Sequence, residues 1–212
     1  MTLPHTLGVV LAGGLSRRMG GDDKVLLAFK GSTLVEHVAQ RLAPQCDGVI
    51  LNANRDPARF EAMPFPVVAD SIEGYLGPLA GVLAALEWSA LHRPDIEWVV
   101  SAPGDTPFIP PDLVQRLHHA RRESGQFLAC ASSGSQVHFA VGLWPVSLRH
   151  DLRHALLEGN MRRAGDWARL HGYAEASWPV DPVDPFFNIN TPDDVTAACL
   201  LAQRDRGEND RA

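Results

Sequence analysis

The segment LGVVLAGGLSRRMGGDDK, residues 7–24, decides the fold class. Its apolar run Leu7–Leu11 has the length of a buried strand, and the small residues Ala12, Gly13 and Gly14 end that run. The chain therefore opens with a buried strand that delivers a glycine-rich loop.

Strands and helices alternate beyond this loop. Short apolar runs predict strands at residues 49–52, 66–69, 98–101 and 127–131. Helical spacing of apolar residues, with Pro and Asp near the ends, predicts helices at residues 33–42, 79–91 and 112–122, and a weaker one at 57–62. This alternation predicts an α/β fold, a single-domain doubly wound sheet whose strands are mostly parallel.

The pattern changes in the C-terminal part of the chain. A strand at residues 137–143 is followed by helices at 148–157 and 162–170 and by a short extended run at 186–190. Thr191 is expected to cap a last helix that ends near Gln203. We therefore expect one domain over residues 1–203 with a C-terminal elaboration, and a disordered charged tail over residues 204–212.

Length, composition and charge limit the classes of protein to which this chain can belong. The chain has 212 residues, 45% of them hydrophobic and 21% charged, which suits one globular domain. A formal net charge of -6 argues against a protein that binds nucleic acid through its phosphates. Three widely spaced cysteines indicate a reducing cytoplasm. No basic region precedes the first apolar run and no segment approaches the ~20 apolar residues of a membrane span, so we expect neither export nor a membrane anchor.

The glycine-rich loop has the properties of a triphosphate site. Gly13 and Gly14 let the backbone approach phosphates and offer N–H groups, and Ser16 adds a hydroxyl. The basic residues that offset polyanionic charge are Arg17, Arg18 and Lys24. The alternative is a solvated surface loop whose glycines only turn the chain, and the combination of all these residues disfavours it.

Two familiar glycine motifs are absent from the loop. A P-loop requires Gly-Lys followed by Ser or Thr, but Asp22 and Asp23 precede Lys24. The dinucleotide fingerprint G-x-G-x-x-G fails because Gly13 and Gly14 are adjacent, which argues against a nicotinamide oxidoreductase.

Residues 11–24 resemble the signature L-A-G-G-x-S-x-R-M-G-x-D-K of the molybdenum cofactor guanylyltransferases. Further blocks similar to that family follow in order over most of the chain: VILNANR at 49–55, VADS at 68–71, GPLAG at 77–81, PGDTPFIPP at 103–111 and FNINTPD at 187–193. The resemblance implies a Rossmann-like fold of the nucleotide-diphospho-sugar transferase type. It also implies transfer of GMP from GTP to the terminal phosphate of molybdopterin, with release of pyrophosphate.

The same resemblance implies which residues form the site. The GTP contacts are Leu11, Ala12, Gly13, Lys24, Asn52, Asp70 and Asp105. Asp105 would also bind Mg²⁺, and the catalytic residues would be Arg18, Lys24 and Asp105. The candidates for binding the acceptor are His138, Arg162, Arg163, Asn188 and Asn190. The basic pair Arg162 and Arg163 is a candidate because it lies in the C-terminal half, where the acceptor would approach, and the alternative is a solvated exposed face. The implied partners are GTP, molybdopterin or molybdenum cofactor, cofactor-delivery proteins and apo-molybdoenzymes.

Three of these residues also have an independent physical interpretation. Asn52 and Asp70 each follow a predicted strand, where open α/β sheets bind ligands, although either residue could instead close a turn or cap a helix. A carboxylate at position 70 that faces the N1 and N2 donors of guanine would select this base. Asp105 supplies hard oxygen ligands for Mg²⁺ and lies too far before the next helix to cap it.

Two rival functions stay open at this point. A sister nucleotidyltransferase that uses CTP or a sugar phosphate would share the loop and the metal. A non-catalytic nucleotide-binding module would not need both Lys24 and Asp105. The histidine pairs, His118 with His119 and His150 with His154, lack a third metal ligand, so we expect solvated surface histidines.

Overall fold

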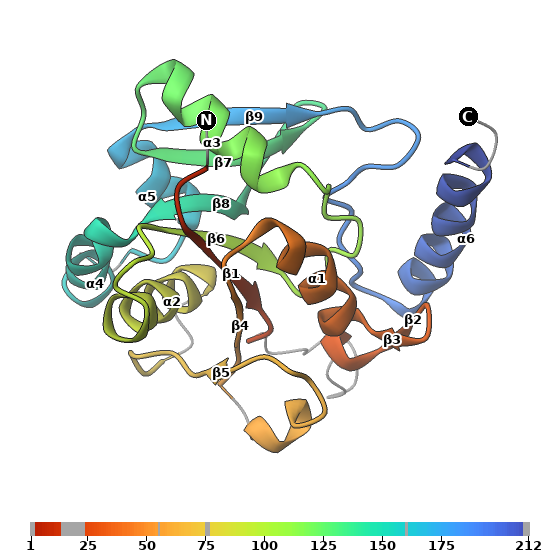
Figure 1. Ribbon diagram of the computed structural model, residues 1–212, viewed down its shortest axis with the longest axis horizontal. Helices are drawn as coiled ribbons and strands as arrows, with labels where there is room; N and C mark the ends of the chain where they lie inside the picture. The colour runs from red at the N-terminus through yellow and green to blue at the C-terminus, as the bar shows by residue number, and fades with distance from the viewer. Residues whose placement is uncertain (1–2, 14–23, 55, 75–76, 160, 210–212) are drawn as a thin grey trace.

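Seven strands form one sheet with helices on both of its faces (Figure 1). The computed structural model describes residues 3–13, 24–54, 56–74, 77–159 and 161–209. The strand order is β5-β4-β1-β6-β8-β7-β9. In chain order the strands are β1 (Thr6–Leu11), β4 (Val49–Asn52), β5 (Val67–Val68), β6 (Trp98–Pro103), β7 (Leu128–Ser133), β8 (Gln136–Pro145) and β9 (Tyr173–Trp178). The expected α/β architecture is confirmed.

The sheet is mostly parallel, as expected. β1 pairs in parallel with β4 and β6, β5 continues beside β4, and β9 pairs in parallel with β7. β8 alone runs against its neighbours β6 and β7. The physical reason is the two-residue connection from β7, because a loop that short permits only an antiparallel hairpin. Gly134 supplies the positive φ of 56° that this turn needs.

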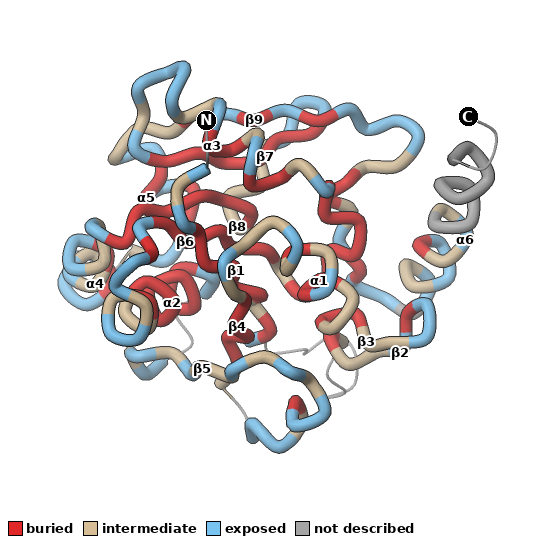
Figure 2. The backbone as a smooth tube through the Cα atoms, viewed as in Figure 1, coloured by how far each residue is buried: buried red, intermediate tan, exposed pale blue. Residues whose placement is uncertain are grey.

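Helices cover the sheet on both faces because consecutive side chains of a strand point to opposite sides. On one face α1 (Leu34–Leu42) and α3 (Leu113–Ser124) pack on residues such as Val10. On the other face α2 (Pro78–His92), α4 (Arg149–Leu157) and α5 (Ala164–His171) pack on residues such as Val9. Figure 2 shows the buried residues concentrated along the sheet and the helices that flank it.

The C-terminal helix α6 (Pro192–Asn209) packs away from the main sheet, beside the small hairpin of β2 (Ala28–Phe29) and β3 (Ser32–Thr33) (Figure 1). A separate apolar cluster joins them, with Phe29 and Leu34 against Ile189 and Ala198. The C-terminal segment is thereby attached to the residues that follow the glycine-rich loop.

Strand β9 was not expected from the sequence. Its residues alternate between buried and more exposed positions, which is the period of a half-buried strand, but its apolar members are small except at the two ends. Conversely, residues 186–190 were expected to be extended, and they belong to no strand.

The last helix is longer than the sequence indicated. We expected it to end near Gln203, and it continues to Asn209. Extension of an existing helix fixes only one residue for each new hydrogen bond, so polar residues without an apolar face can prolong it. Residues 210–212 of the expected tail lie outside the described residues. Within the described part of the chain, no helix is long and apolar enough to cross a membrane.

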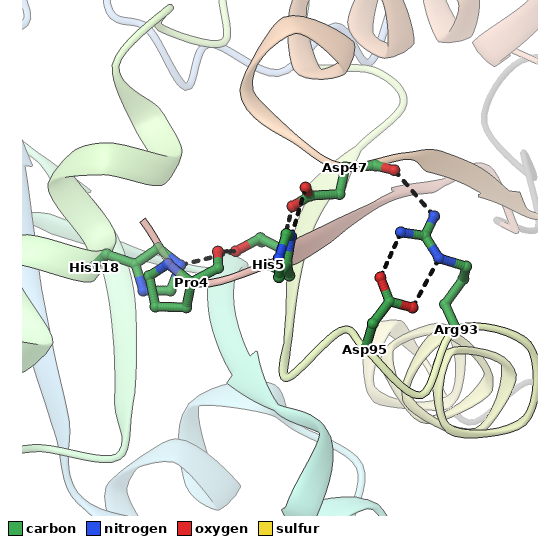
Figure 3. A network of polar contacts seen from close by, with 7 residues as sticks. Pro4, His5, Asp47, Arg93, Asp95 and His118 are labelled. Atoms are coloured by element: carbon green, nitrogen blue, oxygen red, sulfur yellow. Dashed lines mark hydrogen bonds and ion pairs between the residues drawn. The ribbon is translucent and has the colours of Figure 1, made fainter. Parts of the chain in front are cut away.

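His118 is buried, contrary to the expectation of a solvated histidine. Arg121 Nε donates to His118 Nδ1 at 3.2 Å, so Nδ1 is the unprotonated nitrogen of the neutral ring. His118 Nε2 therefore carries the proton and donates to Thr6 Oγ1 at 2.9 Å. The Thr6 hydroxyl in turn donates to the Pro4 carbonyl. Figure 3 shows His118 next to Pro4, just before β1. The same view shows two further pairs, His5 with Asp47 and Arg93 with Asp95. Burial, reinforced by the neighbouring Arg121 and Arg122, lowers the pKa of His118 to about 3.

The buried neutral His118 should make the fold sensitive to acid. Between the unfolded pKa of 6.5 and the folded pKa of about 3, only the unfolded chain takes up this proton, so stability should fall as pH drops through that window. From pH 7 to pH 5 the loss is about 2 kcal/mol for this one group. Urea unfolding at both pH values should show that loss in the wild type and lack it in His118→Gln. His37, whose pKa burial lowers to about 4, titrates in both proteins and cancels in the comparison. Equal losses in the two proteins would contradict the assignment.

Candidate active site

The candidate site lies where the three central parallel strands end. Leu11, the last residue of β1, is in register with Asn52 of β4 and with Pro103 of β6. The carboxyl ends of these strands therefore meet at one edge of the sheet, which is where open α/β sheets bind ligands.

The backbone beyond Leu11 continues for one residue as part of the sheet. Ala12 N donates to Asn52 O at 2.8 Å, and Gly104 N donates to Leu11 O at 3.0 Å. A side chain on Gly13 would lie in van der Waals contact with the amide groups of Asn52 and Asn54, at 3.6 Å and 3.5 Å. The glycine therefore leaves these amides uncovered. Gly14, Ser16, Arg17 and Arg18 lie outside the described residues.

Two amides hold the Asp70 carboxylate on one side of this edge. Asn52 Nδ2 donates to Asp70 Oδ1 at 2.9 Å, and Asn54 Nδ2 donates to Asp70 Oδ2 at 2.6 Å. Asp70 N donates to Asn54 Oδ1 at 2.7 Å, and Asn52 Nδ2 also contacts Val68 O at 3.2 Å. Asp70 is half-buried, whereas Asn52 is only 4% exposed. The predicted Asn52 and Asp70 are thus brought into direct contact.

Gly81 lets the first turn of α2 approach this cluster. A Cβ on Gly81 would overlap Asn52 Oδ1 and would lie 2.7 Å from Leu11 Cδ2, closer than side-chain carbons approach. The helix therefore packs directly on Asn52 only because residue 81 has no side chain. The GPLAG block supplies this glycine one turn after Pro78, the first residue of the helix.

Lys24 and Asp105 form an ion pair on the other side of Leu11. Lys24 Nζ also donates to Asn190 Oδ1 at 3.0 Å, which brings a residue of the C-terminal segment into the site. Ile189 N donates to Asp105 O at 2.9 Å, so the same segment is attached to the turn after β6. The structure therefore brings together Lys24, Asp105 and Asn190, which were predicted from different blocks of the sequence.

One oxygen of Asp105 is a buried acceptor without a partner among the described residues. Asp105 is 7% exposed; its Oδ2 contacts Lys24, whereas its Oδ1 has no hydrogen bond. A buried unpaired carboxylate oxygen is costly unless a cation or donor reaches it. Within the described residues no group of three or more His, Cys, Asp or Glu side chains could hold a metal ion. The unpartnered carboxylate oxygen of Asp105 fits a hard cation such as Mg²⁺ that takes its other ligands from phosphates and water.

The start of α6 fixes the backbone of Asn190. Asp194 Oδ2 accepts hydrogen bonds from Asn190 N and Thr191 N, each at 2.8 Å, and Thr191 Oγ1 accepts from Asp194 N at 3.2 Å. This reciprocal arrangement confirms the predicted cap at Thr191. The Asn190 and Thr191 donors hold the pKa of Asp194 below its usual value, with a contribution from Lys24.

Of the remaining acceptor candidates, Asn188 joins the Lys24 cluster through its backbone, since its carbonyl accepts from Asn190 Nδ2 at 3.4 Å. Among the described residues, His138, Arg162 and Arg163 form no hydrogen bond with either cluster. His138 Nε2 is 2.7 Å from Ser133 Oγ, and burial lowers the pKa of His138, so its imidazole is neutral at pH 7. Arg162 Nη1 donates to Leu156 O at 2.9 Å at the end of α4. Arg163, before α5, and Asn188 are exposed.

Sequence reasoning missed Asn54, Gly81 and Asp194. Asn54 and Gly81 belong to blocks that resemble the family, but nothing in the sequence shows that their positions meet at Asn52. Asp194 had a signal, an acid three residues after a Thr cap, but that pattern predicts a helix start and not a contact with Asn190 beside Lys24.

Comparisons with known proteins agree with this arrangement. A family model described as a MobA-like NTP transferase domain matches residues 8–172. A protein of Nitrobacter hamburgensis named molybdenum cofactor guanylyltransferase is 53% identical over 205 residues, covering 97% of this chain and 98% of that protein. A protein of Rhodopseudomonas palustris with the same name is 52% identical over 202 residues, covering 95% of this chain and 96% of its own length.

The fold also matches a solved structure. The crystal structure of molybdopterin-guanine dinucleotide biosynthesis protein A from Archaeoglobus fulgidus superposes with a TM-score of 0.71, covering 94% of this chain and 99% of that chain at 24% identity. At that identity the likeness shows the fold alone. The family model and the relatives above half identity go further, and they show that the chain belongs to the family of MobA-like NTP transferases.

Proposed function

We propose that this protein transfers GMP from GTP to the terminal phosphate of molybdopterin and releases pyrophosphate. The observation that carries the proposal is the pairing of Lys24 with Asp105, whose second oxygen is buried and unpartnered, at the end of the strand next to the glycine-rich loop. The relatives named molybdenum cofactor guanylyltransferase support the same reaction.

The reaction is an in-line displacement at the α-phosphorus of GTP. A terminal phosphate oxygen of the acceptor forms the new P–O bond, and the bond to the bridging oxygen of pyrophosphate breaks. No covalent enzyme intermediate is needed, so catalysis rests on positioning and on neutralisation of the departing charge. The Lys24 ammonium group would stabilise the triphosphate in the ground state and in the transition state. Arg18 is proposed for the same role from the sequence.

Asp105 is proposed as the protein ligand of Mg²⁺ through its unpartnered Oδ1. When bound, the ion would neutralise phosphate charge and orient the triphosphate. Asn190 Oδ1 also accepts from Lys24 Nζ, so the ammonium has a second partner when phosphate or metal competes for Asp105.

Base recognition is assigned to the cluster of Asn52, Asn54 and Asp70. Leu11, Ala12 and Gly13 lie beside it and would form the backbone wall of the nucleotide site. The Asp70 carboxylate would accept hydrogen bonds from guanine N1 and N2. Adenine and cytosine lack that pair of donors, so the cluster favours GTP.

The acceptor is proposed to approach from the C-terminal half of the chain. Asn190 is beside Lys24, which supports a position for the acceptor phosphate there. Asn188 and Arg163 are exposed, and His138 and Arg162 would contribute as hydrogen-bond donors to the pterin or its phosphate. Reduced cysteines at positions 46, 130 and 199 support a cytoplasmic location, where delivery proteins and apo-molybdoenzymes would exchange the cofactor.

The reaction itself is tested by incubation with purified molybdopterin, Mg²⁺ and each NTP separately, followed by mass spectrometry of the product. We expect GMP transfer with GTP and at least about tenfold less product with CTP, UTP or ATP, because one bidentate base contact discriminates by about that factor. Asp70→Asn, which replaces one acceptor oxygen with a donor, should erase most of this preference. Equal use of CTP, or an unchanged preference in Asp70→Asn, would contradict the account of base selection.

Removal of the Asp105 carboxylate charge should abolish most turnover while the protein stays folded. Asp105→Asn keeps the shape and the backbone contact with Ile189, so its circular dichroism should match the wild type. Loss of metal assistance worth several kcal/mol corresponds to a fall in turnover of about a thousandfold. Asp166→Asn on the exposed side of α5 is the matched control and should be fully active. Near-normal Mg²⁺-dependent activity of Asp105→Asn would remove Asp105 from the metal site.

Lys24 should contribute to both binding and turnover. Lys24→Met keeps the aliphatic stem but lacks the ammonium group, so it should raise the Kd for GTP and lower kcat in steady-state kinetics and equilibrium binding. Arg116→Met, a change of an exposed cation of α3 near Asp112, serves as the control. Unchanged GTP affinity in Lys24→Met would place Lys24 outside the triphosphate site.

A further inference from the structure

We infer that Asn54 is a specificity-determining residue, which fixes the Asp70 carboxylate in the orientation that selects guanine. The inference rests on the proposed function and adds a positioning residue to it. Asn54 was not among the residues expected to contact the nucleotide, and it acts through Asp70.

The geometry is a closed ring of two hydrogen bonds. Asn54 Nδ2 donates to Asp70 Oδ2 at 2.6 Å, and Asn54 Oδ1 accepts from Asp70 N at 2.7 Å. The amide thus binds both the backbone and the side chain of the same residue. With Asn52 Nδ2 on the other oxygen at 2.9 Å, the carboxylate cannot rotate without breaking a hydrogen bond at each oxygen.

The two amides leave the carboxylate able to bind a base. A carboxylate offers about four lone-pair sites, and the amides occupy one on each oxygen. Among the described residues, no other donor takes the second acceptor site of either oxygen. A carboxylate that is fixed in place and keeps one acceptor on each oxygen suits the adjacent N1–H and N2–H donors of guanine, and hypoxanthine lacks the second of these donors.

Only an amide at position 54 can form this ring. It carries a donor and an acceptor on the same planar group, as both partners on Asp70 require. An aspartate there would place an acceptor against the Asp70 carboxylate. Because Asp70 is half-buried, a carboxylate released from Asn54 would turn toward water and lose its fixed direction.

Two features of the hydrogen-bonded ring support a role in binding: it borders the glycine-rich loop, and the backbone around it is held by a separate hydrogen bond. Asn54 Nδ2 lies 3.5 Å from the point that a Gly13 Cβ would occupy, so the amide borders the glycine-rich loop. The loop backbone is held separately, because Ala53 N donates to Val68 O at 3.1 Å. A change in the Asn54 side chain should therefore leave this backbone contact intact.

The test compares GTP with ITP, whose base lacks the 2-amino group. Kd values from calorimetry and kcat values for GMP or IMP transfer are measured for the wild type, Asn54→Ala and Asn54→Asp. Asp56→Ala, which removes an exposed cap from the same loop without touching Asp70, is the matched control. Circular dichroism and thermal unfolding establish that each variant folds.

The wild type and Asp56→Ala should bind GTP about tenfold more tightly than ITP, as expected for a bidentate base contact. In Asn54→Ala and Asn54→Asp the preference should fall to about threefold or less, because GTP loses two contacts with Asp70 and ITP loses only the one at N1, and kcat for bound ITP should change by less than about twofold. Asn54→Asp keeps the shape and the acceptor for Asp70 N, so its loss of preference would identify the donated hydrogen bond as the cause.

Retained preference in both folded variants would overturn the inference and leave the proposed GMP transfer intact. A wild type that transfers GMP without distinguishing GTP from ITP would overturn it as well, because Asp70 would then not read the 2-amino group. Absence of GTP binding in the wild type would instead reject the proposed function. If neither Asn54 variant folds, Asn54 is a structural residue of the loop and the inference is overturned.

Discussion

Parallel pairing of β1 between β4 and β6 is the constraint on which the site depends. The register that places Leu11 opposite both Asn52 and Pro103 makes three strands end together. Side chains that follow those strands in the sequence then meet at one edge, although tens of residues separate them along the chain. The buried apolar faces above and below the sheet hold this register, because a slip of one residue would turn the core side chains of β1 to the wrong face.

The two halves of the site are held by different physical means. On one side, the neutral amides of Asn52 and Asn54 orient the Asp70 carboxylate with hydrogen bonds and leave its charge in place. On the other side, the Lys24 ammonium compensates Asp105 directly. An orienting contact suits recognition of a base, whose donors have fixed directions. A charge-compensating contact suits a polyanion, because the cation can exchange its carboxylate partner for phosphate without a net loss of pairing.

The C-terminal segment completes the charged half of the site. The family model matches residues 8–172, yet Asn190 binds Lys24 and the backbone of Ile189 binds the turn that carries Asp105. The cap of α6 fixes this segment through Asp194, and a small apolar cluster attaches α6 to the β2–β3 hairpin. The last helix therefore acts on the site through packing and capping, at a distance from the sheet.

The sequence by itself determined the α/β class, the central strands, the cap at Thr191, and the blocks that contain Lys24, Asn52, Asp70 and Asp105. The strands, the helices and the cap follow from local patterns, namely apolar runs, helical spacing, and glycine and proline at turns. The blocks were identified by their resemblance to a known family. Tertiary structure alone decided that β9 pairs with β7, since its small apolar residues form a strand only where a neighbour buries them. It also decided that His118 is buried against Thr6, and that Asn54 and Asn190 hold the side chains of Asp70 and Lys24. Each of these contacts joins residues far apart in the chain, and such contacts depend on how the elements pack, which no local pattern encodes.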